Sequence, residues 1–203
     1  MIFKTTTQSP VGALRLFASD RGLRAVLWPQ NDDKQLKLGV EPIERADHPV
    51  LVQAERQLAE YFAGGRRMFD VPLAPTGTPF QLRAWGHLSE IPYGMTRTYG
   101  EQAAAMGQPT ASRAVGAANG RNPLSILVPC HRVIGADGSL TGFAGGLETK
   151  RFLLTLEAEQ VGSKGNGVLA VKHVRMFLAG TASLGILPAA TTVPVAAQQT
   201  PSI

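Results

Sequence analysis

A short run of prolines and glycine near residue 75 divides the chain into a strand-rich part and a helix-rich part. Residues of these two types at such density interrupt helices and strands alike. The run consists of Pro72, Pro75, Gly77 and Pro79. The patterns before it predict strands at 2–7, 13–18, 23–28 and 69–73 and one amphipathic helix at 50–62. We therefore expect a small N-terminal α/β domain at residues 1–78.

The segment after the run has mainly helical periodicity. It predicts helices at 80–91, 99–106, 110–119 and 148–159 and a buried strand at 124–134. Two short helices separated by a tight turn, here with Gly107, form the helix-turn-helix pattern, although most such pairs are simply packed helices. We expect a mostly helical domain at residues 79–163, and we expect residues 164–203 to be a flexible tail of unknown role.

Composition excludes several classes of protein. The chain has 44% hydrophobic residues, which is normal for a globular core. Its one cysteine excludes an intrachain disulfide and a cysteine-based zinc cluster. No apolar run of signal-peptide length opens the sequence, and the uncharged stretch 176–203 is too interrupted to predict a membrane span. These features predict a cytoplasmic protein that does not act at a membrane.

The positive charge is concentrated in the middle of the chain. The formal net charge is +5, and residues 79–132 carry five arginines against two acidic residues. The planar guanidinium group suits phosphate recognition and stacking better than an ammonium group does. A polyanionic partner and a solvated surface are equally good explanations of charge alone. The helix at 110–119 surrounds Arg113 with alanine and glycine, which favours close approach either to another surface or to a neighbouring helix.

The only cysteine follows an apolar segment and precedes two basic residues, in the order Pro129, Cys130, His131 and Arg132. A thiol reacts as the thiolate, and nearby cations and hydrogen-bond donors lower its pKa. Neighbouring side chains usually diverge, so a bridging water would be needed for His131 to act on the sulfur. Glu157 is a candidate to orient that histidine. The alternatives are an inert buried cysteine and a surface glutamate.

The segment around this cysteine, ILVPCHRVIGADGSLTGFAGGL at 126–147, resembles the active-site signature of the O6-alkylguanine-DNA alkyltransferases, the methylated-DNA–protein-cysteine methyltransferases. The resemblance covers residues 79–160, and the N-terminal segment is compatible with the ribonuclease H-like domain of that family. The further matching positions are Ile91–Gly94, Thr98, Tyr99, Arg113–Gly116, Asn122, Pro123, Lys150, Leu153, Leu154 and Glu157.

The resemblance implies roles for the residues of the active site. Cys130 would be the acceptor that takes the alkyl group from guanine O6. His131, acting through water with Glu157 behind it, would generate the thiolate, so the thiol pKa should lie below its ordinary value. Asn122 would be the hinge between the recognition helix and the active-site strand.

The resemblance also implies how DNA is bound and how the damaged base is read. Arg113 would fill the stack that the extruded nucleotide leaves, on a small-residue surface that includes Ala114 and Gly116. Tyr99 would help to rotate the nucleotide and would donate to the base. The carbonyl of Val133 and the N–H of Ala144 would contact the flipped guanine.

The activity so implied is a single-turnover, cofactor-free and metal-free repair of O6-alkylguanine, and of O4-alkylthymine, in double-stranded DNA. The expected partner is the minor groove, read with little sequence preference, and the expected state is a monomer. The alternative is an alkyltransferase-like protein that binds damage without repairing it, but such proteins lack the acceptor cysteine. A bifunctional transcriptional activator would need four zinc-binding cysteines, and a thiol hydrolase would turn over repeatedly.

Three positions depart from the family pattern. Ser112, beside Arg113, stands where alanine is common, which is a minor change at the expected DNA-binding face. Gln102 stands where an aliphatic residue is usual, which predicts looser packing between the two short helices. Ser125 stands where some members have a proline against the alkyl group, so the preference for bulky alkyl groups does not follow from the resemblance.

Overall fold

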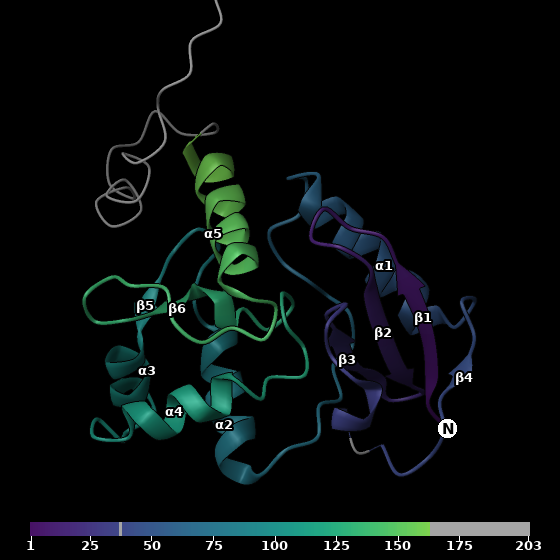
Figure 1. Cartoon of the computed structure of the whole chain (residues 1–203), viewed down its shortest axis with the longest axis horizontal. Coiled ribbons are helices and arrows are strands. Elements are labelled where there is room, and N and C mark those ends of the chain that lie inside the picture. Colours follow the sequence, from purple (N-terminus) through teal and green to yellow (C-terminus); the bar gives the residue numbers. More distant parts are fainter. Residues whose placement is uncertain (37, 163–203) are drawn as a thin grey trace, which may run out of the picture.

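The computed structural model describes residues 1–36 and 38–162, and the predicted tail at 164–203 lies outside them. Figure 1 shows a sheet covered by one long helix on the right and a group of helices on the left. The chain is thus a mixed α/β protein with an N-terminal sheet and a helical C-terminal part, in agreement with the fold class expected from the sequence.

The N-terminal sheet has four strands in the order β3-β2-β1-β4. Neighbouring strands are antiparallel except β1 and β4, which run parallel. Side chains alternate between the two faces, so Leu14, Leu16 and Ala18 of β2 enter the main core while Phe17 enters a smaller cluster on the opposite face. The strands are β1 (Phe3–Thr7), β2 (Leu14–Ser19), β3 (Gly22–Leu27) and the short β4 (Ile43–Glu44), of which β4 was not predicted.

Helix α1 (Pro49–Phe62) packs on the sheet with the face that the sequence periodicity indicates. Proline stands at its first turn, where no intrahelical N–H is needed. Leu51, Ala54 and Leu58 are buried as expected. Gln57 and Tyr61 are buried as well, each 0% exposed, whereas the predicted Phe62 is only partly buried.

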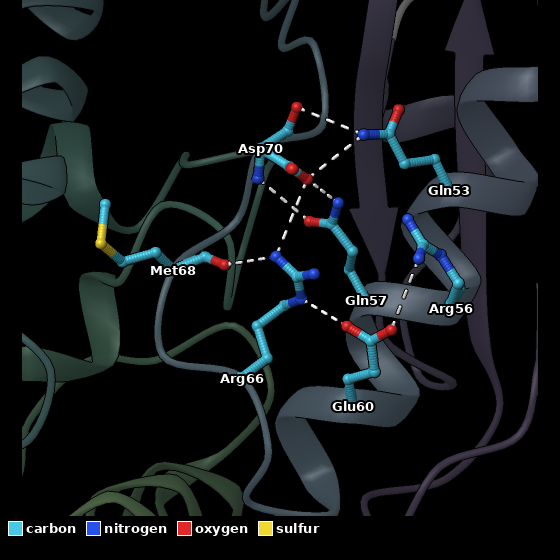
Figure 2. A network of polar contacts seen from close by, with 7 residues as sticks. All are labelled: Gln53, Arg56, Gln57, Glu60, Arg66, Met68 and Asp70. Atoms are coloured by element: carbon cyan, nitrogen blue, oxygen red, sulfur yellow. Dashed lines mark hydrogen bonds and ion pairs between the residues drawn. The ribbon is translucent and has the colours of Figure 1, made fainter.

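The segment after α1 returns along that helix and is fastened to it by a polar network (Figure 2). The Gln57 side chain donates to the Asp70 carboxylate and accepts from the Asp70 N–H at 3.0 Å. Arg66 donates from Nε to Glu60 Oε2 at 2.6 Å and from Nη1 to the Met68 carbonyl at 2.8 Å. These side chains thus provide hydrogen-bond partners for backbone groups of the connection, the Met68 carbonyl and the Asp70 N–H, which have no partner in the sheet.

The prediction of a strand at 69–73 is therefore wrong. Only an isolated parallel bridge joins Leu23 to Leu73, with Leu23 N–H donating to the Pro72 carbonyl at 2.7 Å. Pro72 has no N–H to give, so it cannot complete a ladder. Within this segment Val71 is buried and Phe69 packs against Tyr61 of α1, whereas Leu73 is 40% exposed, so the apolar residues reflect partial burial rather than strand formation.

Capping signals in the sequence set where two C-terminal helices begin. Thr78 and Gln81 form a reciprocal capping box at the start of α2, and Thr98 and Glu101 form another at the start of α3. The turn between α3 and α4 contains Gly107 at φ 73°, a conformation that glycine adopts without strain. The C-terminal helices are α2 (Pro79–Ser89), α3 (Tyr99–Ala105), α4 (Ser112–Asn119) and α5 (Leu147–Gly162).

The segment predicted as one buried strand at 124–134 is buried throughout but is not a strand. It consists of turns, a short 3-10 helix η2 (Cys130–Arg132) and the two-residue strand β6 (Val133–Ile134), which pairs in parallel with β5 (Arg97–Thr98). Ile126 has φ 76°, and Pro129 lacks an N–H, so neither can continue a ladder.

One continuous hydrophobic core joins the sheet, α1 and the helical part. It includes Trp28 from the end of β3, Trp85 from α2 and Leu153 from α5, and it reaches Cys130. Among the residues that the structure describes, no helix is long and apolar enough to cross a membrane.

Candidate active site around Cys130

A braced turn presents Cys130 at the edge of the core. Asn122 Nδ2 donates to the Val128 carbonyl at 2.8 Å, and Asn122 Oδ1 accepts from the Leu124 N–H at 3.0 Å. The turn between these contacts contains Ile126 in the left-handed region, which is costly for a β-branched residue. The amide of Asn122 thus holds together the turn that leads to Cys130.

The thiol of Cys130 is buried, with 6% of the residue exposed. Burial raises the pKa of the Cys130 thiol, while hydrogen bonds with Asn122 and Ser125 and the charge of Lys150 act in the opposite direction. This direction is the opposite of the one expected from the sequence. The free site therefore keeps the thiol protonated near neutral pH and places the groups that favour a thiolate around it.

His131 is fully buried and contacts Glu157 directly. Its Nε2 lies 2.8 Å from Glu157 Oε1. Because a carboxylate can only accept, Nε2 carries the proton in this pair and Nδ1 has its lone pair free in the neutral ring. Nδ1 is buried and has no hydrogen-bond partner among the described residues. Burial lowers the pKa of His131 although Glu157 opposes this shift, so the imidazole is neutral near pH 7.

Glu157 is the centre of a larger buried cluster. Arg132 donates to it from Nε and from Nη2, both at 2.9 Å, and donates from Nη1 to the Ile91 carbonyl at 2.6 Å. Glu157 also accepts from the Gly94 N–H at 3.0 Å and the Tyr61 hydroxyl at 2.8 Å. Burial alone raises the pKa of this carboxyl, but the hydrogen bond from His131 and the charge and hydrogen bonds of Arg132 outweigh it and hold the pKa well below its ordinary range.

Lys150 joins the site to the glycine-rich loop at 135–146. Its Nζ donates to the Val133 carbonyl at 2.6 Å and to the Thr141 carbonyl at 2.8 Å. Burial lowers the pKa of Lys150 to about 8. The Tyr99 hydroxyl donates to the same Thr141 carbonyl at 3.2 Å. Tyr99, Val133 and Cys130 are therefore brought to one region through Lys150 and this loop.

The N-terminal part of the chain supports the loop from the other side. Gln30 Nε2 donates to the Ala144 carbonyl at 3.0 Å, and the rings of Trp28 and Phe143 meet edge to face at 5.3 Å. A Cβ atom at Gly145 would lie 2.8 Å from the Trp28 ring, so only glycine allows this approach. Ala144, one of the predicted base contacts, is exposed at this position.

The predicted DNA-binding residues lie on the outer face of α4. Arg113 and Ala114 are exposed, Gly116 is partly exposed, and Val115 and Ala118 are buried beneath them. Gly116 lies beside Tyr99, whose ring would be 3.6 Å from a Cβ atom at this position. The alanine and glycine residues therefore form a surface without large side chains that extends to Tyr99. Arg113 lies on this surface, away from the buried Cys130 cluster.

Gln102 does not leave the packing of α3 against α4 loose. Its side chain exchanges hydrogen bonds with Asn119, at 2.7 and 3.3 Å, and donates to the Ala84 carbonyl at 3.0 Å. Gln102 is 0% exposed and Asn119 is 6% exposed. A buried polar pair with its hydrogen bonds made thus replaces the expected apolar contact.

The sequence reasoning missed Tyr61 and gave no role to Lys150 or Trp28. The relevant signal for Tyr61 was its position on the buried face of a helix, which by itself indicates only a core residue. Its contact with Glu157 spans 96 positions of the chain. No local pattern connects residues at such a separation.

Comparisons with known proteins agree with this arrangement. The family described as 6-O-methylguanine DNA methyltransferase matches in two parts, the ribonuclease-like domain at residues 2–75 and the DNA binding domain at residues 79–159. A methylated-DNA–protein-cysteine methyltransferase of Methanosarcina acetivorans is 51% identical over 150 residues, which are 74% of this chain and 94% of that protein. The constitutive enzyme of Bacillus subtilis is 46% identical over 158 residues, 77% of this chain and 96% of that protein.

Solved structures give the same result. The O6-methylguanine methyltransferase of Mycobacterium tuberculosis matches with a TM-score of 0.71 and 45% identity, over 79% of this chain and 94% of that one. The structure of the same organism's OGT in complex with DNA matches with a TM-score of 0.68 and 45% identity, over 76% of this chain and 92% of that one. This chain belongs to the 6-O-methylguanine DNA methyltransferase family, in its ribonuclease-like part and in its DNA-binding part alike.

Proposed function

We propose that this protein repairs O6-alkylguanine in DNA by moving the alkyl group irreversibly onto Cys130, once per molecule. The observation that carries the assignment is the position of the chain's only cysteine next to the buried His131–Glu157–Arg132 cluster. The same chemistry extends to O4-alkylthymine, whose alkyl group is bonded in the same way to an exocyclic oxygen. A damage-binding protein without repair activity would not need a cysteine at this position.

The relay begins with neutral His131, whose Nδ1 takes the thiol proton through a bridging water. The Cys130 sulfur then attacks the alkyl carbon in line with the bond to O6. That bond breaks, its electron pair goes to the guanine, and the guanine regains a proton while Cys130 keeps a stable thioether. Since Glu157 is ionised, it stabilises the imidazolium that forms on His131. No redox partner or cofactor enters this balance.

The raised pKa of Cys130 fits a site that is activated only when occupied. The nearby Lys150 ammonium stabilises the thiolate as it forms, because the two groups attract each other in a buried setting. Asn122 and Ser125 direct hydrogen bonds to the sulfur. In the free protein, a protonated thiol protects the acceptor from side reactions.

Three groups near the loop at 135–146 read the extruded base. Tyr99 stands between α4 and the loop, where its hydroxyl can shift from the Thr141 carbonyl to the base. The Val133 carbonyl accepts from Lys150 and has a second lone pair for an N–H of guanine. The N–H of Ala144 completes the set, since Ala144 is exposed and belongs to the same loop.

The exposed face of α4 binds double-stranded DNA along the minor groove. Ala114 and Gly116 allow close backbone approach without reading sequence, which suits a protein that must find damage anywhere. Arg113 enters the stack in place of the flipped nucleotide, where a planar cation stacks well. One chain contains all the residues named for this site, and we propose that the protein acts as a monomer.

Intact-mass measurement after mixing the protein with O6-methylguanine duplex DNA tests this function. We expect each molecule to gain one methyl group in place of the thiol hydrogen, and peptide mapping should locate it on Cys130. Repair should stop when one equivalent of methyl has been transferred. Repeated turnover of limiting protein, or a methyl group on another residue, would exclude the proposal.

Replacing Arg113 with alanine should impair repair selectively on duplex DNA. Extrusion of a base from a duplex costs a few kcal/mol, and free O6-methylguanine base has no such cost. We expect the alkylation rate to fall about tenfold or more on the duplex and to change little on the free base. Single-turnover rates on the two substrates give this ratio directly.

Two variants control for charge in this experiment. Arg113→Lys should rescue poorly, because lysine keeps the charge but has no plane to stack. Arg121→Ala removes the same charge from an exposed position just beyond α4 and should leave the ratio of the two rates near the wild-type value. An equal loss on duplex and free base for Arg113→Ala would mean that Arg113 supports the active site instead.

A further inference from the structure

The contact between Tyr61 and Glu157 links the N-terminal helix α1 to the proton relay. The Tyr61 hydroxyl donates to Glu157 Oε1 at 2.8 Å, and both side chains are 0% exposed. The Tyr61 ring is held among Phe62, Phe69 and Tyr93, with centroid distances of 5.4, 5.5 and 6.1 Å. The packing of the ring therefore holds the hydroxyl within hydrogen-bond distance of the carboxylate.

Tyr61 shares its acceptor atom with the catalytic histidine. Glu157 Oε1 accepts from Tyr61, from His131 Nε2 and from Arg132 Nη2, whereas Oε2 accepts from Arg132 Nε and the Gly94 N–H. Each donor to an oxygen withdraws some of the charge that remains for the others. The hydrogen bond from Tyr61 therefore weakens the interaction between Oε1 and the imidazolium form of His131. The same hydrogen bond keeps Oε1 at the position where it contacts the ring.

We propose that Tyr61 is a positioning residue of the alkyl-transfer site, whose hydroxyl orients Glu157 and limits how strongly that carboxylate holds a proton on His131. This inference rests on the proposed function of the relay. Without the hydroxyl, Oε1 interacts more strongly with the imidazolium, and His131 becomes protonated at a higher pH. A protonated His131 cannot accept the thiol proton, so the reaction loses its base in the acidic range.

The Tyr61→Phe change leaves every other charged and titratable group around His131 in the sequence. These groups are Glu157 and Lys150 from α5, Arg132 and Cys130 from η2, and Tyr93 from the segment after α2. Arg132 and Lys150 oppose a second positive charge on the ring, and Glu157 favours it. A tyrosine-to-phenylalanine change therefore alters one hydrogen bond to Glu157 in an otherwise constant environment.

The experiment compares Tyr61→Phe with Tyr93→Phe. Tyr93 is a matched control, because its hydroxyl is also buried near Arg132 but has no hydrogen-bond partner among the described residues. Single-turnover methyl transfer is measured between about pH 5 and 8, the range in which a histidine titrates. The His131 ring is followed in parallel by NMR of ¹³C-labelled histidine, assigned among the four histidines with a His131→Gln sample.

For Tyr61→Phe we expect the His131 pKa and the acid limb of the rate profile to move upward together, by about one pH unit. Tyr93→Phe should leave both at the wild-type position. A uniform loss of rate in Tyr61→Phe without a shift would show that Tyr61 is merely structural and would overturn the inference. An equal shift in Tyr93→Phe would overturn it as well.

A second measurement should shift the His131 pKa in the opposite direction, and it leaves the aromatic core intact. In the Tyr93→Phe background, incorporation of 3-fluorotyrosine makes the Tyr61 hydroxyl a stronger donor, so the His131 pKa should fall. An unchanged or higher His131 pKa would contradict the proposal. The NMR titration does not depend on activity: wild-type protein that fails to become methylated would refute the proposed function and leave this result interpretable.

Discussion

Cys130→Ala is expected to abolish methyl transfer completely and to leave DNA binding in place. The chain has one cysteine, so the variant has no thiol to accept the group. Cys130 is buried, whereas Arg113 and Ala114, the proposed DNA contacts, are exposed on α4. Transfer is measured with radiolabelled methylated duplex DNA, and binding is measured with the same duplex at one fixed salt concentration, because phosphate contacts make affinity depend on salt.

Cys130→Ser is the matched variant for this experiment. It keeps a group that can bond with Asn122 and Ser125, but a serine hydroxyl does not ionise near neutral pH, so it too should be inactive. If both variants lose DNA binding together with transfer, Cys130 would be needed for the shape of the site and the two functions would not be separable. Methyl transfer by the alanine variant would refute the role of Cys130.

Glu157→Gln is expected to destabilise the protein strongly and to slow alkylation. The glutamine leaves the buried Arg132 guanidinium without a counter-charge, and its amide nitrogen must face a donor at one of the two carboxylate positions. Breaking a buried ion pair from one side costs about 3–5 kcal/mol in the free energy of unfolding. Loss of the group that orients His131 should slow transfer about 100-fold or more. Urea unfolding and single-turnover rates measure the two effects.

The loss of stability in Glu157→Gln should depend on pH, and the direction of that dependence follows from the Glu157 pKa. The pKa of Glu157 is depressed in the folded state, so its contribution to stability is present above the unfolded value of ~4.3 and is lost as the pH falls below it. The stability difference between wild type and Glu157→Gln should thus be constant above about pH 5 and shrink below about pH 4. Glu159→Gln removes an exposed charge from the same helix and should change stability by about 0.5 kcal/mol or less. A constant difference down to pH 3 would mean that Glu157 is not ionised in the native cluster.

Local signals in the sequence determined much of the secondary structure. Thr78 with Gln81, and Thr98 with Glu101, cap the starts of α2 and α3, and a capping box is a local feature because its two residues are only three positions apart. The apolar periodicity of α1 and the alternation in β1 to β3 are also local, and the structure confirms them. The family assignment rests equally on short motifs, since a series of them in the right order is itself a property of the sequence.

Tertiary structure decided what local signals could not. The apolar run at 124–134 looks like a strand, but Asn122 braces a turn there and Ile126 adopts a left-handed conformation that the rest of the fold maintains. Gln102 looks like a packing defect until Asn119, from the next helix, completes its hydrogen bonds. Each outcome depends on a partner that the sequence pattern does not identify.

The ionisation of the active site shows the same division. Sequence alone determined that the one cysteine stands beside a histidine and an arginine, and it made Glu157 on the last helix a candidate partner of that histidine. Only the folded chain decided that burial raises the Cys130 pKa, that Arg132 keeps Glu157 ionised, and that Tyr61 reaches Glu157 from a helix 96 positions away. The physical reason is that desolvation and charge interactions depend on distance in space, and distance along the chain does not determine it.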